Sequence, residues 1–174
     1  MEHLPRLLLI DDEEPFRETL AKRLKETGYE VLDVGSGMDA LTLLDREKID
    51  IVITDIQMPG LSGLEILSEI RAKHIGVEVI MLTGHGEVSS AVEGMRLGAY
   101  DYLMKPYEYE YLVVKIQEAY RVKRKRDQRL KKTKECSLIK KKATVIKLVH
   151  DCKREVLLTS TPLPNAETIS SMIP

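Results

Sequence analysis

Residues Arg6–Asp12 read RLLLIDD, a short apolar run that ends in two carboxylates. A run of this length without alternating polar residues is typical of a strand buried on both faces of a parallel sheet. Two similar runs follow along the chain, and two shorter or more alternating stretches complete the set. The predicted strands are Arg6–Ile10, Glu30–Val34, Ile51–Thr54, Val77–Leu82 and Tyr102–Met104.

Segments with helical spacing separate these strands. Apolar residues recur every four positions from Phe16 to Leu24, and Gly28 stands where a helix C-cap is expected. Ser62 and Glu65 have the spacing of a capping box at the start of another helix. Further helices are predicted over Val88–Leu97 and Tyr109–Arg126. The repeated alternation predicts an open α/β sheet with right-handed crossovers and helices on both faces.

Polar residues stand at the ends of four predicted strands. Asp11 and Asp12 follow the first strand, Asp55 the third, Thr83 the fourth and Lys105 the fifth. In such sheets ligands bind outside the carboxyl ends of the strands. Three carboxylates gathered there would repel one another without a cation, and a ligand set made of oxygen atoms favours Mg²⁺.

Asp55 is the best-placed nucleophile of this set, because its strand is central in the predicted sheet. A carboxylate that attacks phosphorus requires neutralisation of charge on the transferring group, which a metal ion and Lys105 would supply. Thr83 offers a hydroxyl to the same group. The residues therefore predict an acyl phosphate at Asp55.

Four motifs contain these residues: LLIDDEE (Leu8–Glu14), TDIQMPGLSGLE (Thr54–Glu65), MLTGHG (Met81–Gly86) and GAYDYLMKP (Gly98–Pro106). Together they resemble the receiver domain of two-component response regulators, and the last two most resemble receivers of the nitrogen-regulation type. The resemblance covers residues 4 to about 122, and the sequence departs from the family's pattern at none of the five key positions.

The resemblance implies a flavodoxin-like (βα)5 domain that accepts a phosphoryl group from a phosphohistidine on a sensor histidine kinase. Asp55 matches the phosphoacceptor, Asp12 the direct metal ligand and Asp11 its neighbour in the acidic pocket. The backbone carbonyl of Gln57 matches the third protein ligand of Mg²⁺, and Lys105 matches the lysine that binds the phosphoryl group. Such a domain is not an ordinary enzyme, because it catalyses only its own phosphorylation and dephosphorylation.

The resemblance also implies a switch. Thr83 and Tyr102 match the pair that couples phosphorylation to the face formed by the fourth helix and the fifth strand. A downstream protein or a second copy of the chain would bind this face together with the fifth helix. Taken alone, Tyr102 is interpreted as a half-buried strand aromatic. The family also has a cis peptide bond at the position of Lys105 and Pro106.

The charge of the chain reverses near Tyr120. Residues 1–120 hold 12 Lys and Arg against 23 Asp and Glu, whereas residues 121–154 hold 15 against 3. We expect residues 123–158 to form a basic helical extension, and residues 159–174, rich in Ser, Thr and Pro, to be disordered. A coiled coil is disfavoured by the scarcity of apolar residues over 122–134. Further along the chain, Ile139, Ala143, Ile146 and Val149 have the spacing of one apolar helix face, which indicates a second short helix.

The basic block bears on the partners of the chain. Its charge is compatible with nonspecific binding to nucleic-acid phosphates, but the block lacks interleaved aromatic residues, which argues against recognition of single strands. No glycine-rich loop for an ATPase module is present, and too few residues remain for a helix-turn-helix. We therefore expect a stand-alone or truncated receiver.

Composition sets the expected compartment. The apolar stretch Leu7–Ile10 is too short for a signal peptide or a membrane span, which predicts a cytoplasmic protein. Cys136 and Cys152 lack metal-ligand spacing and are expected to be free thiols.

Two other classes of protein compete with this interpretation. Phosphatases related to haloacid dehalogenase also use an aspartate nucleophile with Mg²⁺, but they need a second Asp two residues later, where this chain has Gln57. A pure interaction module with a vestigial site is the other alternative. The intact set of polar residues argues against it, because an unused carboxylate cluster is an electrostatic cost without a purpose.

Overall fold

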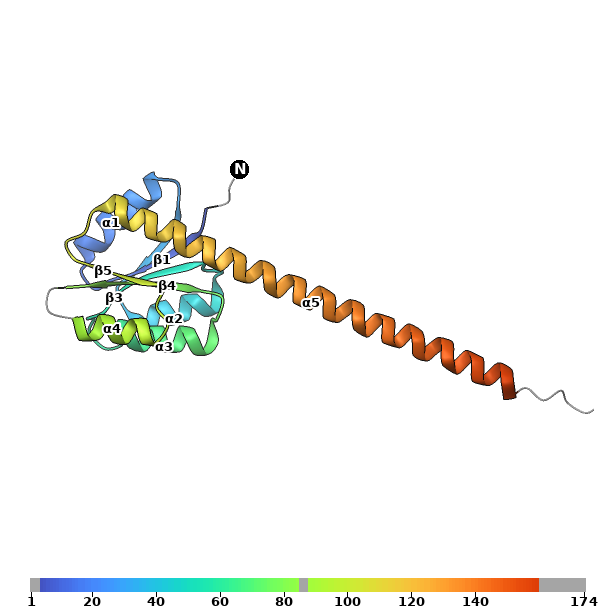
Figure 1. Ribbon diagram of the computed structural model, residues 1–174. Coiled ribbons are helices and arrows are strands. Elements are labelled where there is room, and N and C mark those ends of the chain that lie inside the picture. Colours follow the sequence, from blue (N-terminus) through green and yellow to red (C-terminus); the bar gives the residue numbers. More distant parts are fainter. Residues whose placement is uncertain (1–3, 85–87, 160–174) are drawn as a thin grey trace, which may run out of the picture. The chain divides into compact units, whose positions relative to one another are not determined.

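The computed structural model describes residues 4–84 and 88–159 of the 174-residue chain. Within these residues five strands alternate with five helices (Figure 1). Their order is β1 (Arg6–Ile10), α1 (Glu14–Glu26), β2 (Glu30–Val34), α2 (Gly37–Arg46), β3 (Ile51–Asp55), α3 (Gly63–Lys73), β4 (Glu78–Thr83), α4 (Val88–Arg96), β5 (Asp101–Met104) and α5 (Tyr109–Thr159).

The five strands form one parallel sheet in the order β2-β1-β3-β4-β5. Leu7 of β1 is in register with Val31 of β2 on one side and with Ile51 of β3 on the other. This order is the doubly wound, flavodoxin-like topology, so the predicted fold class is confirmed. Because all strands run the same way, their carboxyl ends share one edge of the sheet.

Two apolar cores cover the two faces of the sheet, and alternate side chains of each strand enter different cores. Leu7 and Leu9 pack with residues of α1 and α5, whereas Leu8 and Ile10 pack with residues of α2 and α3. Figure 1 shows the same division, with α1 and the first turns of α5 on one face and α2, α3 and α4 on the other. Burial on both faces explains why β1, β3 and β4 read as nearly continuous apolar runs.

Local signals explain where several helices begin and end. The predicted capping box is confirmed: the Ser62 hydroxyl accepts from the Glu65 N–H, and the Glu65 carboxylate accepts from the Ser62 N–H at 2.9 Å. Gly28 follows α1 with a φ of +94°, which favours glycine. Helix α2 was not among the predicted helices; Ser36 caps it by accepting a hydrogen bond from the Asp39 N–H.

The fifth helix continues past Arg126 without a break to Thr159, so the residues expected to form a basic helical extension, 123–158, are helical. The segment expected to be a second short helix is therefore part of α5. Of residues 159–174, only Thr159 is described, as the end of α5, so the predicted disorder beyond it lies outside the described residues. None of the helices in the described ranges is long and apolar enough to cross a bilayer.

The chain divides into two compact units after Gln128. The first unit contains the whole sheet, helices α1 to α4 and the first turns of α5. In its described part, the second unit consists of the remainder of α5. The exposed Cys136 of this second unit is a free thiol.

Candidate functional site

Two carboxylates and one ammonium meet at the carboxyl edge of the sheet. Asp11 directly follows β1, Asp55 ends β3, and Lys105 directly follows β5. The Lys105 Nζ lies 2.8 Å from Asp11 Oδ2 and 2.5 Å from Asp55 Oδ2. The predicted convergence of these three residues, which are far apart in the sequence, is therefore observed.

Backbone groups fix the remaining oxygens of the two carboxylates. The Glu13 N–H donates to Asp11 Oδ1 at 2.9 Å, and the Gln57 N–H donates to Asp55 Oδ1 at 3.1 Å. Asp11 is fully buried, whereas 11% of the Asp55 side chain is exposed. Of the two, only the Asp55 carboxylate is open to a reactant from solvent.

Burial dominates the electrostatics of this cluster. Desolvation raises the pKa of the Asp11 carboxyl above its ordinary value, although the hydrogen bond from Lys105 opposes that shift. Burial also lowers the pKa of the Lys105 ammonium, but its hydrogen bonds to Asp11 and Asp55 outweigh burial and leave the pKa above its usual value. Lys105 is therefore charged at neutral pH and offsets the two acids.

Thr83 ends β4 beside this cluster and is almost completely buried. Strand β4 adjoins β3, and the Ile56 N–H donates to the Leu82 carbonyl at 3.0 Å, which holds the ends of the two strands together. The Lys105 N–H donates to the Thr83 carbonyl at 2.7 Å and ties in the fifth strand. The expected cis peptide bond between Lys105 and Pro106 is confirmed.

Asp12 and Gln57 lie at the same edge, but the carboxylate of Asp12 does not join the cluster. Asp12 is exposed, and within the described ranges its side chain makes no hydrogen bond or ion pair. No group of three or more His, Cys, Asp or Glu side chains among the described residues could hold a metal ion. The donors that the sequence supplies here are nevertheless all oxygen atoms, a set that fits a hard cation such as Mg²⁺.

Tyr102 lies on β5 with 41% of its surface exposed, and its backbone is in register with Met81 of β4. Its neighbour Leu103 is buried. The ring of Tyr102 therefore belongs to the outer surface of this edge strand and not to the core.

Sequence reasoning missed two residues that shape the site. The ring of Phe16 lies 4.2 Å from the Lys105 Nζ, a cation–π contact that the helical spacing alone did not indicate. A Cβ atom on Gly63 would overlap the carbonyl oxygen of Asp55, so only glycine lets α3 start this close to the end of β3. In the sequence, the glycine directly after the Ser62 cap was the feature that could have indicated this close approach.

A cavity of about 520 Å³ opens beside Lys105, between α1 and the segment that joins β5 to α5. Its wall contains the buried Tyr107 hydroxyl, which has no hydrogen-bond partner among the described residues. Burial, together with the charges of Asp11 and Asp55, raises the pKa of Tyr107. The cavity is lined by Phe16, Thr19, Leu20, Arg23, Gly84, Lys105, Pro106, Tyr107 and Tyr109.

Comparison with known proteins assigns this arrangement to a family. The family model described as "Response regulator receiver domain" matches residues 7–117, which is well over half of the chain. The chain belongs to this family. The resemblance to receivers of two-component response regulators is thereby confirmed, and it is a family of signalling phosphoacceptors rather than of conventional enzymes.

Individual relatives agree with this assignment. The transcriptional regulatory protein GlrR of Escherichia coli K12 is 38% identical over 120 residues, which cover 68% of this chain and 27% of GlrR. FixJ of Azorhizobium caulinodans is 45% identical over 103 residues, which cover 58% of this chain and 47% of FixJ. This receiver chain thus spans about a quarter of one relative and about half of the other.

Solved structures give the same answer. The receiver domain of NtrX from Brucella abortus is 32% identical, with a TM-score of 0.64 over 66% of this chain and 98% of that chain. A response regulator receiver domain protein from Clostridium thermocellum is 38% identical, with a TM-score of 0.67 over 70% and 98%. The resemblance of the last two motifs to receivers of the nitrogen-regulation type agrees with this similarity to NtrX.

Proposed function

We propose that this receiver accepts a phosphoryl group on Asp55 from a phosphohistidine of a sensor histidine kinase and thereby switches an interaction surface. The supporting observation is the Lys105 ammonium, which bridges the buried Asp11 and the partly exposed Asp55. This arrangement leaves a nucleophile accessible and a fixed positive charge beside it. The receiver would occupy residues 4–122, and residues 123–158 would be its basic extension.

In the proposed transfer, an oxygen of the Asp55 carboxylate attacks the phosphorus of the phosphohistidine. The new P–O bond forms as the P–N bond to the imidazole breaks, and the departing imidazole takes up a proton from water. Lys105 then donates to an oxygen of the phosphoryl group, and the Thr83 hydroxyl donates to another. Water later hydrolyses the acyl phosphate, which returns the Asp55 carboxylate and releases phosphate.

Receivers of this family typically depend on Mg²⁺. Asp12, Asp55 and the backbone carbonyl of Gln57 would bind the ion, with Asp11 completing the acidic pocket. When bound, Mg²⁺ would neutralise charge on the transferring group. The burial of Asp11 supports this role, because a buried carboxylate gains most from a nearby cation.

The proposed output is a change on the face formed by α4, β5 and α5. A dianionic group at Asp55 would draw the Thr83 hydroxyl toward it, and the exposed ring of Tyr102 would turn into the space that Thr83 leaves. The equilibrium would shift between two existing conformations. A downstream protein or a second copy of the chain would then recognise the altered face in the cytoplasm.

The cavity beside Lys105 is the proposed place of approach for the kinase. Its aromatic and apolar wall, with Phe16 and Tyr107, adjoins Lys105, which in turn contacts the nucleophile Asp55. A helix of the partner that carries the phosphohistidine would bury this wall and exclude bulk water during transfer.

Incubation with acetyl phosphate tests the proposal. With Mg²⁺ we expect intact mass spectrometry to detect one added phosphoryl group in the wild type, none after chelation with EDTA, and none in Asp55→Asn. Asp45→Asn, a change of an exposed Asp outside the site, should be modified like the wild type. Lack of modification in the wild type would favour the pure interaction module.

A further inference from the structure

A second concave site lies at the opposite edge of the sheet from Asp55. It is a cavity of about 290 Å³ between the residues that precede β1 and the third and later turns of α5. Its described lining carries three cationic side chains and no carboxylate, although residues 1–120 as a whole are strongly acidic. The lining consists of Leu4, Pro5, Gln117, Tyr120, Arg121, Arg124, Lys125 and Gln128.

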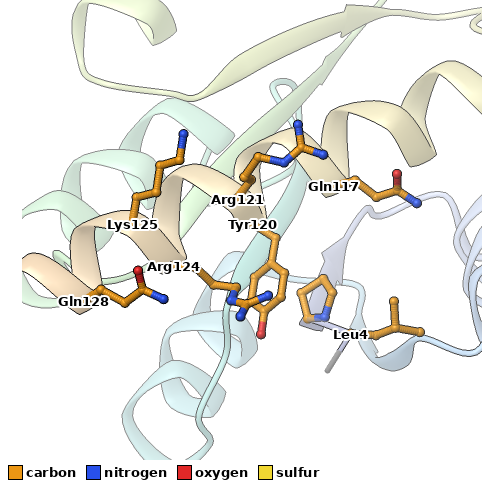
Figure 2. Close-up of a pocket in the computed structure, with 8 residues that line it drawn as sticks. Leu4, Gln117, Tyr120, Arg121, Arg124, Lys125 and Gln128 are labelled. Atoms are coloured by element: carbon orange, nitrogen blue, oxygen red, sulfur yellow. The ribbon is translucent and has the colours of Figure 1, made fainter. Parts of the chain in front are cut away.

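One cation of this cavity stands beside an aromatic ring. The Arg124 guanidinium lies 5.9 Å from the centre of the Tyr120 ring. Figure 2 shows Arg124 next to Tyr120 on one side of α5, whereas Arg121 and Lys125 extend from the helix in another direction. Within the described ranges, neither Arg121 nor Lys125 forms an ion pair or hydrogen bond, so both remain available to an anion.

The cavity is supported by a fixed segment of helix. On the opposite side of α5, Lys123 pairs with Asp50 at 3.2 Å and Arg126 pairs with Glu78 at 3.0 Å. These ion pairs hold this part of α5 against the sheet. The residues on the other side of the same turns are therefore presented in constant positions, as a binding site requires.

We propose that this cavity binds a nucleoside phosphate. The phosphate would lie on Arg121, Arg124 and Lys125, because guanidinium and ammonium groups form charge-assisted hydrogen bonds with phosphate oxygens. The base would pack on Tyr120 and the apolar wall beside it.

The size of the cavity limits the ligand. At about 290 Å³ it lies just below the usual range for ligand sites, about 300–1,000 Å³, and so it suits no more than one nucleotide unit. Gln117 and Gln128 stand at opposite ends of the cavity (Figure 2), and the side-chain amide of either one offers both donors and acceptors to the edge of a base. The nucleotide would be either free in solution or part of a single-stranded nucleic acid.

Titration of the full chain with fluorescently labelled AMP and with a labelled single-stranded oligonucleotide tests the proposal. Saturable binding of AMP would indicate that the ligand is a free nucleotide, and binding of the oligonucleotide alone would indicate a nucleic acid. Either result supports the site if the double variant Arg121→Gln/Lys125→Gln lowers the affinity for the probe at least about tenfold. The matched control is Lys131→Gln/Lys132→Gln, which removes equal charge further along α5 and should leave the affinity unchanged.

Three results would overturn the proposal. If the two double variants lowered the affinity for the probe equally, the binding would be a diffuse attraction to the basic block. If neither probe bound, the cavity would not be a binding site. Competition by inorganic phosphate as strong as that by unlabelled AMP would mean that the base is not recognised. Both double variants change exposed residues, so thermal unfolding is expected to show that they fold like the wild type.

Discussion

The ammonium of Lys123 lies 3.2 Å from a carboxylate oxygen of Asp50, and both residues are buried. The other Asp50 oxygen accepts from the Arg6 N–H at 3.0 Å, at the amino end of β1. Lys123 also pairs with Asp127 at 2.6 Å. A residue of the basic block is thus part of the interior of the first unit, where it holds α5 against the sheet.

Removal of this cation tests its structural role. In Lys123→Met the buried Asp50 loses a charged partner, and we expect the free energy of unfolding to fall by about 3 kcal/mol. Lys125→Met, two residues away and exposed, should change it by less than about 0.5 kcal/mol. Urea unfolding followed by tyrosine fluorescence reports on this unit, because every tyrosine lies at or before Tyr120. Equal stability of the two variants would contradict this role.

The contact between Gly63 and the end of β3 predicts a second effect. An added methyl group in Gly63→Ala would push against the backbone of Asp55, so we expect a loss of stability of about 2 kcal/mol and slower phosphorylation by acetyl phosphate. Gly76→Ala is the control, since a Cβ there meets nothing within 4 Å. Normal phosphorylation and stability of the Gly63 variant would show that α3 tolerates displacement.

The capping box of α3 predicts a pH dependence. Hydrogen bonds from the Ser62 hydroxyl and backbone lower the pKa of the Glu65 carboxyl below 4.5. A group with a lowered folded pKa stabilises the fold above its unfolded pKa and loses this contribution as pH falls through the folded pKa. The urea concentration at the midpoint of unfolding should therefore be higher for the wild type than for Glu65→Gln near neutral pH. This difference should shrink below pH 4.5. A constant difference would exclude ionised Glu65 as its source.

The exposed ring of Tyr102 allows a direct test of the switch. The chain contains no Trp, so Tyr102→Trp supplies a single tryptophan, whose emission can be excited separately from that of the tyrosines. If phosphorylation turns this ring inward, its emission should move to shorter wavelength when acetyl phosphate and Mg²⁺ are added. Tyr120→Trp, at the other edge of the sheet, should show no change. Phosphorylated Tyr102→Trp with unchanged emission would argue against the proposed switch.

The sequence predicted those features that depend on local pattern. Strands β1, β3 and β4 were predictable because their side chains are buried on both faces, and the start of α3 because Ser62 and Glu65 are three residues apart. The meeting of Asp11, Asp55 and Lys105 followed from the rule that parallel strands end at one edge.

Features that depend on distant contacts were not predictable. Lys123 looks like its solvated neighbours in a basic block, and only the folded chain brings Asp50 to it. Helix α2, by contrast, was not predicted although its sequence carries local signals, with Ser36 as its N-cap and Ala40 and Leu44 as buried apolar residues four positions apart. The position of Asp12 outside the ion-paired cluster likewise has no signature in the sequence.

The most direct test of the central claim is to locate the phosphoryl group. Borohydride reduces an acyl phosphate of aspartate to homoserine, which peptide mass spectrometry identifies at a single residue. After reaction with acetyl phosphate and Mg²⁺, we predict homoserine at Asp55 and unchanged aspartate at Asp11 and Asp12. Homoserine at either of the other two residues, or at none, would contradict the assignment of Asp55 as the phosphoacceptor.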